Sequence, residues 1–135
     1  MSERPEVDVD AATVREYLLA ERHAVWQATL DCADALAETG DTSADRFERV
    51  LREYGVVDAL PGVLAGAVEA LGAQLPAEPV AAPPYVVVTR AGPVARATLP
   101  DRGRLVLSVE AFERRDGEWV RAGETPEEAL TVELR

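Results

Sequence analysis

The sequence predicts an α+β fold, with about three N-terminal helices packed on one face of a C-terminal four- or five-stranded antiparallel β-meander. Residues 11–75 carry apolar side chains at the three-, four- and seven-residue spacings of amphipathic helices. Four prolines between positions 76 and 84 end that pattern and mark an extended linker. Short apolar segments then alternate with Gly-containing turns, as they do in consecutive hairpins. The 135 residues suffice for one domain, 10–135, after a polar segment, 1–9, that we expect to be frayed.

The first two predicted helices have clear end signals. Asp10 is a suitable N-cap for a long helix from Ala11 to about Glu38, and Gly40 is suited to the position just after its end. Ser43 then caps a second helix, Ala44–Tyr54. Both segments have one apolar stripe, so we expect each helix to bury one face.

The third predicted helix, Val57–Leu75, differs because only Asp58, Glu69 and Gln74 in it are polar. Asp58 would be its cap, with Pro61 in the first turn. Such a helix must be buried on several sides, so we expect it to be the innermost one. Its large apolar residues would meet the sheet, and its small side would meet the first helix. The small side comprises Gly62, Gly66, Ala70 and Ala73.

Five strands are predicted after the Pro-rich linker, residues 76–84. They are Tyr85–Arg90, Pro93–Leu99, Arg104–Arg114, Glu118–Ala122 and Ala129–Leu134. Three turns would join the first four: Ala91-Gly92, Asp101-Arg102-Gly103 and Asp116-Gly117, the last being a strong type I′ signal. A capping box at Thr125–Glu128 precedes the last strand.

The turns set a register that sorts side chains onto two faces. We expect one apolar face, against the helices: Val86, Val88, Ala95, Ala97, Leu99, Leu105, Leu107, Val109, Ala111, Val120 and Ala122. The outer face would be mixed: Tyr85, Val87, Thr89, Val94, Arg96, Thr98, Arg104, Val106, Ser108, Glu110, Phe112, Arg114, Trp119 and Arg121. A bulge in the 104–114 strand would change the face assignments at its Phe112 end.

The outer sheet face is the candidate functional surface, because it combines arginines with aromatic side chains. Its candidate residues are Tyr85, Arg96, Arg104, Phe112, Arg114, Trp119 and Arg121. Residues 1–83 carry 6 Arg and 16 acids, a net −10, whereas residues 84–135 carry 8 Arg and 9 acids, a net −1. Three interpretations stay open: a solvated face or one partly covered by the first helix, a protein interface, or a site for an anionic ligand or single-stranded nucleic acid.

Other chemistry finds little support in the sequence. No lysine is present, which excludes Schiff-base and P-loop lysine chemistry. His23 is the sole histidine and lacks the neighbours of a metal site, and Cys32, in mid-helix, fits a small buried hydrophobe. Asp31, Asp34 and Glu38 share a helical face that could bind a cation but is more typical of a hydrated surface. We therefore expect no catalytic residues, no metal and no cofactor.

The composition is strongly acidic, with 25 acidic residues against 14 basic ones, a net charge of −11, and Arg as the only basic residue type besides the single His. With its abundant Ala and Val and few aromatic residues, the chain resembles small uncharacterised proteins of extremely halophilic archaea. This resemblance covers the whole chain and implies an acidic surface in molar salt, where the Debye length is about 3 Å. It implies no activity.

A cytoplasmic setting is expected. The N-terminal segment is acidic without an apolar run, so it does not fit a signal peptide. The single Cys32 cannot form an intramolecular disulfide, and the charged residues and Pro61 of 57–75 argue against a membrane span.

We therefore expect a non-enzymatic interaction or structural module of a salt-adapted cell, forming a homo-oligomer or binding a protein partner. The alternative is a domain that binds a small anionic ligand or nucleotide. Its anion contacts would come from Arg96, Arg104, Arg114 and Arg121, and Trp119 and Phe112 would stack on the ligand. The net charge argues against nucleic acid as the partner.

Overall fold

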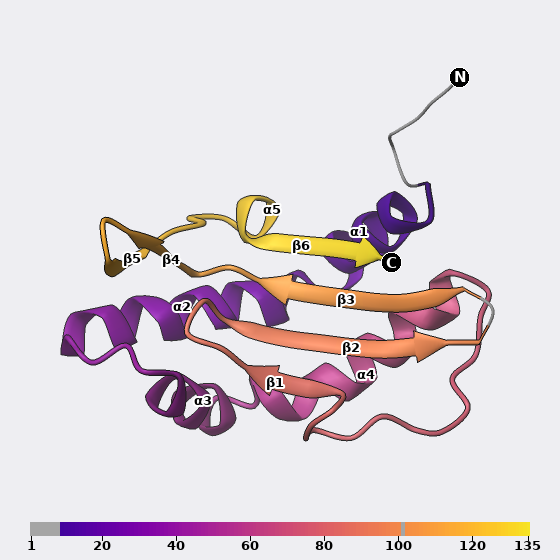
Figure 1. Ribbon diagram of the computed structural model, residues 1–135, viewed down its shortest axis with the longest axis horizontal. Coiled ribbons are helices and arrows are strands. Elements are labelled where there is room, and N and C mark those ends of the chain that lie inside the picture. Colours follow the sequence, from indigo (N-terminus) through magenta and orange to yellow (C-terminus); the bar gives the residue numbers. More distant parts are fainter. Residues whose placement is uncertain (1–8, 101) are drawn as a thin grey trace.

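A computed structural model describes residues 9–100 and 102–135 and confirms the α+β fold. Four helices lie on one face of a four-stranded antiparallel sheet, and a two-stranded hairpin extends from one end of that sheet (Figure 1). The predicted frayed segment lies outside the described residues, except Val9, which begins the first helix. The helices are α1 Val9–Glu21, α2 His23–Thr39, α3 Ala44–Glu53, α4 Val56–Ala70 and the short α5 Pro126–Ala129. The strands are β1 Val86–Val88, β2 Pro93–Leu99, β3 Gly103–Val109, β4 Phe112–Arg115, β5 Glu118–Arg121 and β6 Leu130–Leu134.

The long first helix predicted over residues 11–38 is in fact two helices that meet at Arg22. Arg22 has φ −126° and ψ 22°, outside the helical range. Its N–H and the Trp26 indole Nε1 both donate to the Leu18 carbonyl, each at 3.0 Å. The break therefore depends on a buried tryptophan that reaches back to the end of α1. No Gly or Pro marks it in the sequence.

The second predicted helix, 44–54, corresponds closely to α3. Ser43 caps α3, and its side chain accepts a hydrogen bond from the Arg46 N–H at 3.3 Å. The third predicted helix, 57–75, is α4 in the structure. It begins at Val56 rather than at the predicted cap Asp58, because Gly55 takes the N-cap position with φ +77°. It also ends earlier than predicted, at Ala70, so its last predicted residues belong to the turn before the linker.

Helix α4 is the innermost helix, as predicted. Seven of its side chains are buried: Val56, Val57, Leu60, Val63, Leu64, Ala67 and Val68. It contacts α1, α2 and α3 on one side and β1 and β2 on the other. Of its predicted small side, Gly66 faces α1, since a Cβ built on Gly66 would lie 2.3 Å from the Tyr17 hydroxyl oxygen, whereas Gly62 is exposed with nothing within 4 Å and Ala73 lies beyond the end of α4.

The sheet has the strand order β1-β2-β3-β6, and every pairing is antiparallel. The β1–β2 connection has four residues, 89–92, instead of the predicted two, because Val88 pairs with Pro93. Asp101 of the predicted 101–103 turn lies outside the described residues. The Asp116-Gly117 turn is confirmed, with φ values of +52° and +82° at the two residues between Arg115 and Glu118.

The predicted 104–114 strand breaks between Val109 and Phe112. The N–H groups of Ala111 and Phe112 both donate to the Ala91 carbonyl, at 2.8 and 3.0 Å, which is the two-against-one pairing of a β-bulge. The chain bends there, β4 and β5 leave the sheet as a separate hairpin, and β6 pairs with β3 in their place. The capping box predicted at Thr125–Glu128 is present and starts α5 just before β6.

The bulge also corrects the face assignments near its position. Phe112, predicted on the outer face, is only 1 % exposed and packs edge-on against Phe47 of α3, with ring centroids 5.5 Å apart. Before the bulge, the alternation is as predicted. The inner residues Val86, Ala95, Ala97, Leu99, Leu105, Leu107 and Val109 are all buried.

Candidate functional site

In the described part of the chain, the outer face of the four-stranded sheet carries no helix, since all four long helices lie behind it in Figure 1. We call this surface the open sheet face, and it comprises Val87, Val94, Arg96, Thr98, Arg104, Val106, Ser108, Thr131 and Glu133. The last two come from β6, which the sequence placed beside the hairpin instead. Cover by the first predicted helix is therefore excluded, because α1 and α2 lie behind the sheet, whereas a solvated face, a protein interface and a ligand site all stay open.

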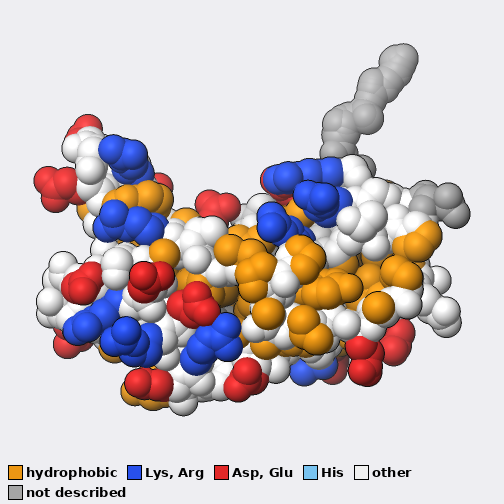
Figure 2. All heavy atoms as spheres, turned by 60° about the horizontal axis from the view of Figure 1, so that its bottom comes forward, with side chains coloured by type: hydrophobic (Ala, Val, Ile, Leu, Met, Phe, Trp, Pro, Cys, Tyr) orange, Lys and Arg blue, Asp and Glu red, His pale blue; other side chains and the backbone are white. Residues whose placement is uncertain are grey.

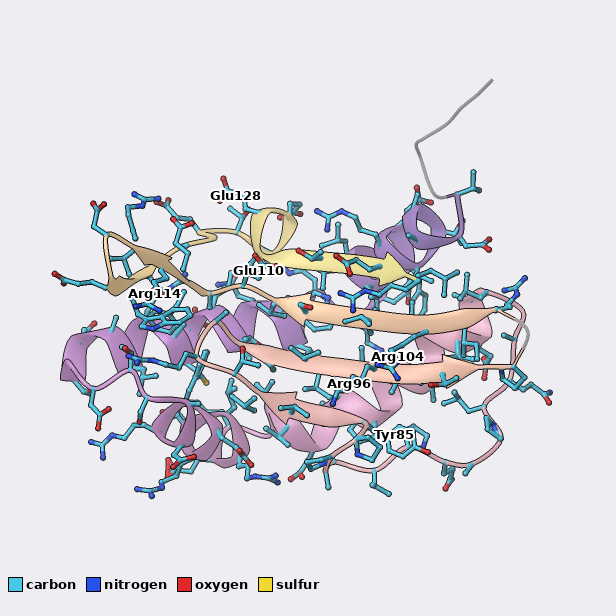
Figure 3. The ribbon with its side chains drawn as sticks, viewed as in Figure 1. Tyr85, Arg96, Arg104, Glu110, Arg114 and Glu128 are labelled. Atoms are coloured by element: carbon cyan, nitrogen blue, oxygen red, sulfur yellow. The ribbon has the colours of Figure 1, made fainter. Side chains whose placement is uncertain are left out.

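Three of the seven candidate residues come together at one end of the open sheet face. Tyr85, Arg96 and Arg104 lie close together in Figure 3, on neighbouring strands and the segment before β1. They border a pocket of about 190 Å³ whose other walls are Leu75, Pro76, Pro84, Ala97 and Thr98. We call it the arginine pocket.

The walls of the arginine pocket are positively charged. The described residues of these walls contribute two guanidinium groups and no carboxylate. Among residues 9–100 and 102–135, neither Arg96 nor Arg104 makes an ion pair. The Arg96 Nε donates to the Pro84 carbonyl at 3.0 Å, which holds the guanidinium while its two terminal nitrogens stay available. In a chain of net charge −11, such a site is locally attractive to anions.

The linker supplies the apolar part of this pocket, and sequence reasoning missed it. Leu75 and Pro76 follow α4, and Pro84 precedes Tyr85, so the Pro-rich segment runs beside β2. Figure 2, which turns the β1 side forward, shows apolar side chains gathered over one area with arginines at its rim. Val80 of the linker is 54 % exposed. The proline run was the one available signal, but it carries no periodicity from which a contact could be inferred.

Arg114 and Trp119 belong to a different place. They pair directly across the β4–β5 hairpin, and Arg114 lies at the opposite end of the molecule from Arg104 in Figure 3. The Arg90 guanidinium carbon lies 5.2 Å from the centroid of the Trp119 ring, a cation–π distance that joins the β1–β2 loop to the hairpin. The seven candidates therefore do not form one surface.

Arg121 has a structural position that the sequence did not reveal. Its guanidinium donates to the carbonyl oxygens of Ala111, Ala122, Gly123 and Leu30, and its Nε lies 2.8 Å from the Asp34 carboxylate on α2. The side chain is 21 % exposed, so most of it is buried between hairpin and helix. We call these contacts the Arg121 clamp.

Figure 3 also labels Glu110 and Glu128, which border a hollow beside β5 that several glutamates and Arg121 line. Both carboxylates have structural partners. Glu128 accepts from the Glu124 and Thr125 N–H groups, and Glu110 accepts from the Thr131 hydroxyl at 3.4 Å. This hollow is therefore part of the capping of α5 and the packing of β6.

The remaining sequence candidates show no sign of chemistry. His23 is exposed at the start of α2. Cys32 is buried, and burial, followed by the charge of Asp31, raises the pKa of its thiol to about 11. The thiol is therefore neutral at ordinary pH, and the thiolate is the nucleophile. No cluster of three or more His, Cys, Asp or Glu suited to a metal occurs in the described part of the chain.

In the same part of the chain, no helix combines the length and the apolar character needed to cross a membrane. Neither a curated protein nor a solved structure matches the sequence. A family profile does match it: the domain of unknown function DUF7988, over residues 12–135. That match covers α2, α3, α4 and all of α1 but its first residues. It also covers the Pro-rich linker and both sheets. The chain therefore belongs to the DUF7988 family.

Proposed function

We propose that this protein is a non-enzymatic interaction module whose open sheet face binds a second copy of the same chain. The observation that carries the proposal is that no helix of residues 9–100 and 102–135 covers this face. In the described residues, its valines Val87 and Val94 are partly exposed beside Ser108 and Thr131. Small β-branched and hydroxyl side chains give a flat surface that another sheet can approach closely.

The apolar area over the linker extends this surface, as Figure 2 shows. Contiguous exposed apolar side chains are typical of contact sites between proteins. Arginine at the rim of such an area is also common at interfaces. A second copy brings the same valines, the same arginines and Glu133, so both apolar contacts and Arg–Glu contacts are available.

The composition supports a salt-adapted, cytoplasmic setting for this module. The chain has 25 acidic residues, and no lysine, for a net charge of −11. Two such chains repel each other in dilute buffer, whereas molar salt screens the repulsion within about 3 Å. We therefore propose that self-association is strongest at high salt.

Light scattering in about 2–3 M KCl tests the proposal at an ionic strength that screens charge repulsion. The wild type should have twice the monomer mass. Val94 and Ser108 are register partners on the open sheet face, so the double variant Val94→Glu/Ser108→Glu should be monomeric. Its matched control is Ala24→Glu/Ala35→Glu, which adds the same charge to exposed positions on α2 and should keep the wild-type mass. A monomeric wild type, or equal masses for both variants, contradicts the proposal.

A further inference from the structure

We propose that the arginine pocket binds a small organic oxyanion, a carboxylate or phosphate ester with a short apolar or ring-shaped body. This inference goes beyond self-association and needs no second copy, because one chain supplies every wall of the pocket. Arg96, Thr98 and Arg104 also belong to the open sheet face, so a second copy bound there would compete with the ligand. Arg96, Arg104, Thr98 and Tyr85 line a space that also has an apolar side.

The charge arrangement defines the anionic end of the ligand. Arg96 and Arg104 lie on neighbouring strands and have no ion-pair partner among the described residues. Glu133 is the acidic residue of the open sheet face and lies opposite Val106. Its Oε1 accepts a hydrogen bond from the Arg135 Nε at 2.8 Å. Glu133 is therefore paired with Arg135 and with neither of the two pocket arginines.

The positioning of Arg96 is suited to an oxyanion. Its Nε is used by the Pro84 carbonyl, so the planar group has a fixed orientation and can present both terminal nitrogens to two oxygens at once. Arg104 has no hydrogen-bond partner for its side chain among the described residues, so it is free to close on the same anion from β3. Such charge-assisted pairs are about twice as strong as neutral hydrogen bonds.

The volume and the apolar wall limit the rest of the ligand. A space of about 190 Å³ is smaller than a typical drug-sized site, about 300–1,000 Å³. Leu75, Pro76 and the Tyr85 ring form its apolar side. A single ring or a short chain fits this space beside the oxyanion, whereas a whole nucleotide extends beyond it.

Isothermal titration of the full chain with phenyl phosphate tests the proposal, with benzoate, inorganic phosphate and phenol as comparison probes. Phenyl phosphate and benzoate should bind with a saturable heat, inorganic phosphate more weakly, and phenol without measurable heat. Arg96→Gln and Arg104→Gln should each weaken binding about tenfold or more. The matched control Arg114→Gln removes the same charge from the distant hairpin and should leave the affinity unchanged. Tyr85→Ala should weaken phenyl phosphate binding more than inorganic phosphate binding.

The absence of saturable binding for both ring-bearing anions up to about 10 mM, or equal loss in all three Arg variants, overturns the pocket. Light scattering on the titrated samples shows whether the chain is a monomer or a dimer. A monomer that binds phenyl phosphate in molar KCl contradicts the dimer and supports the pocket. A dimer is titrated again in dilute buffer, where the chains repel each other, and failure of that monomer to bind contradicts the pocket alone.

Discussion

Replacing Phe112 with Ala tests the main correction to the sequence-based picture. Phe112 is 1 % exposed and meets the Phe47 ring of α3 edge-on at 5.5 Å between centroids. Removing a buried Phe side chain costs about 3–5 kcal/mol in lost burial and cavity formation. The same change on a solvated sheet face would alter stability by only about 0.5 kcal/mol. The two placements of Phe112 therefore differ by a factor of six or more in the expected effect.

Urea titration followed by circular dichroism at constant high salt is the assay. Urea is preferred to guanidinium, which would also change the ionic strength around a chain of net charge −11. Since Phe112→Ala removes a large part of a typical stability of about 5–15 kcal/mol, Phe112→Leu is measured as well and should cost about 1–2 kcal/mol. Tyr54→Leu, at a position that is 65 % exposed, is the control and should stay within about 0.5 kcal/mol.

A double-mutant cycle then isolates the contact between the rings. Phe47→Leu and Phe112→Leu should couple by about 0.5–1.5 kcal/mol, the range for aromatic pairs. Phe112→Ala at wild-type stability with an unchanged urea slope would refute the buried placement. Additivity of the two Leu variants within about 0.3 kcal/mol would refute the pairing with Phe47.

Four further predictions concern the Arg121 clamp, helix α4, one tightly packed glycine and the buried thiol. Arg121→Ala should lower the free energy of unfolding by about 2–3 kcal/mol, because buried carbonyl groups lose a charged donor. Urea titration measures this change. An unchanged free energy of unfolding would mean that the Arg121 clamp does not stabilise the fold. Gly62→Ala should raise stability by about 0.5–1 kcal/mol, since nothing lies within 4 Å of the added Cβ on α4; a loss on thermal melting contradicts this. Gly92→Ala should instead prevent folding or cost several kcal/mol, because its Cβ would lie 1.8 Å from a β3 carbonyl oxygen, and a folded, wild-type melt contradicts it. Burial, followed by the charge of Asp31, raises the pKa of the Cys32 thiol from 9.0 to about 11. At pH 8 the folded protein should therefore react with a disulfide reagent about 100-fold more slowly than the chain unfolded in urea. Equal rates would show that the thiol is accessible.

The sequence predicted those elements whose signals are local. The type I′ turn at Asp116-Gly117, the capping box at Thr125–Glu128 and the cap at Ser43 are all confirmed, because each depends on a few neighbouring residues. The two sheet faces before the bulge were also right although the β1–β2 loop was two residues longer than predicted. Each side chain points to the same face after a shift of two residues.

The failures lie where distant residues decide local geometry. The α1–α2 break at Arg22 depends on the Trp26 indole finding the Leu18 carbonyl, and helix periodicity runs through it without change. The bulge before Phe112 depends on one carbonyl, that of Ala91, serving two N–H groups. Neither partner is adjacent in the sequence, so propensity and spacing carry no trace of them.

The candidate site was predictable only where it depends on local sequence patterns. Arg96 and Arg104 share a face by strand alternation alone, and Tyr85 follows from its place just before β1. Leu75 and Pro76 reach the pocket through the path of the linker, which no periodic pattern describes. The sequence placed Arg121 on the outer sheet face, whereas in the structure the bend of the chain brings its side chain against α2.

The return of β6 to β3 has a consequence for how this family can diversify. Five register pairs join β3 and β6, from Leu105↔Leu134 to Val109↔Leu130, so the central sheet is complete without the β4–β5 hairpin. The hairpin connects β3 and β6, which already pair with each other. Phe112 and the Arg121 clamp anchor its base to the helices. Beyond that base, its tip at Asp116-Gly117 meets no neighbouring atoms within 4 Å of a Cβ built on Gly117. Insertions between relatives should therefore accumulate at this tip, where added chain leaves the strand order and the core unchanged.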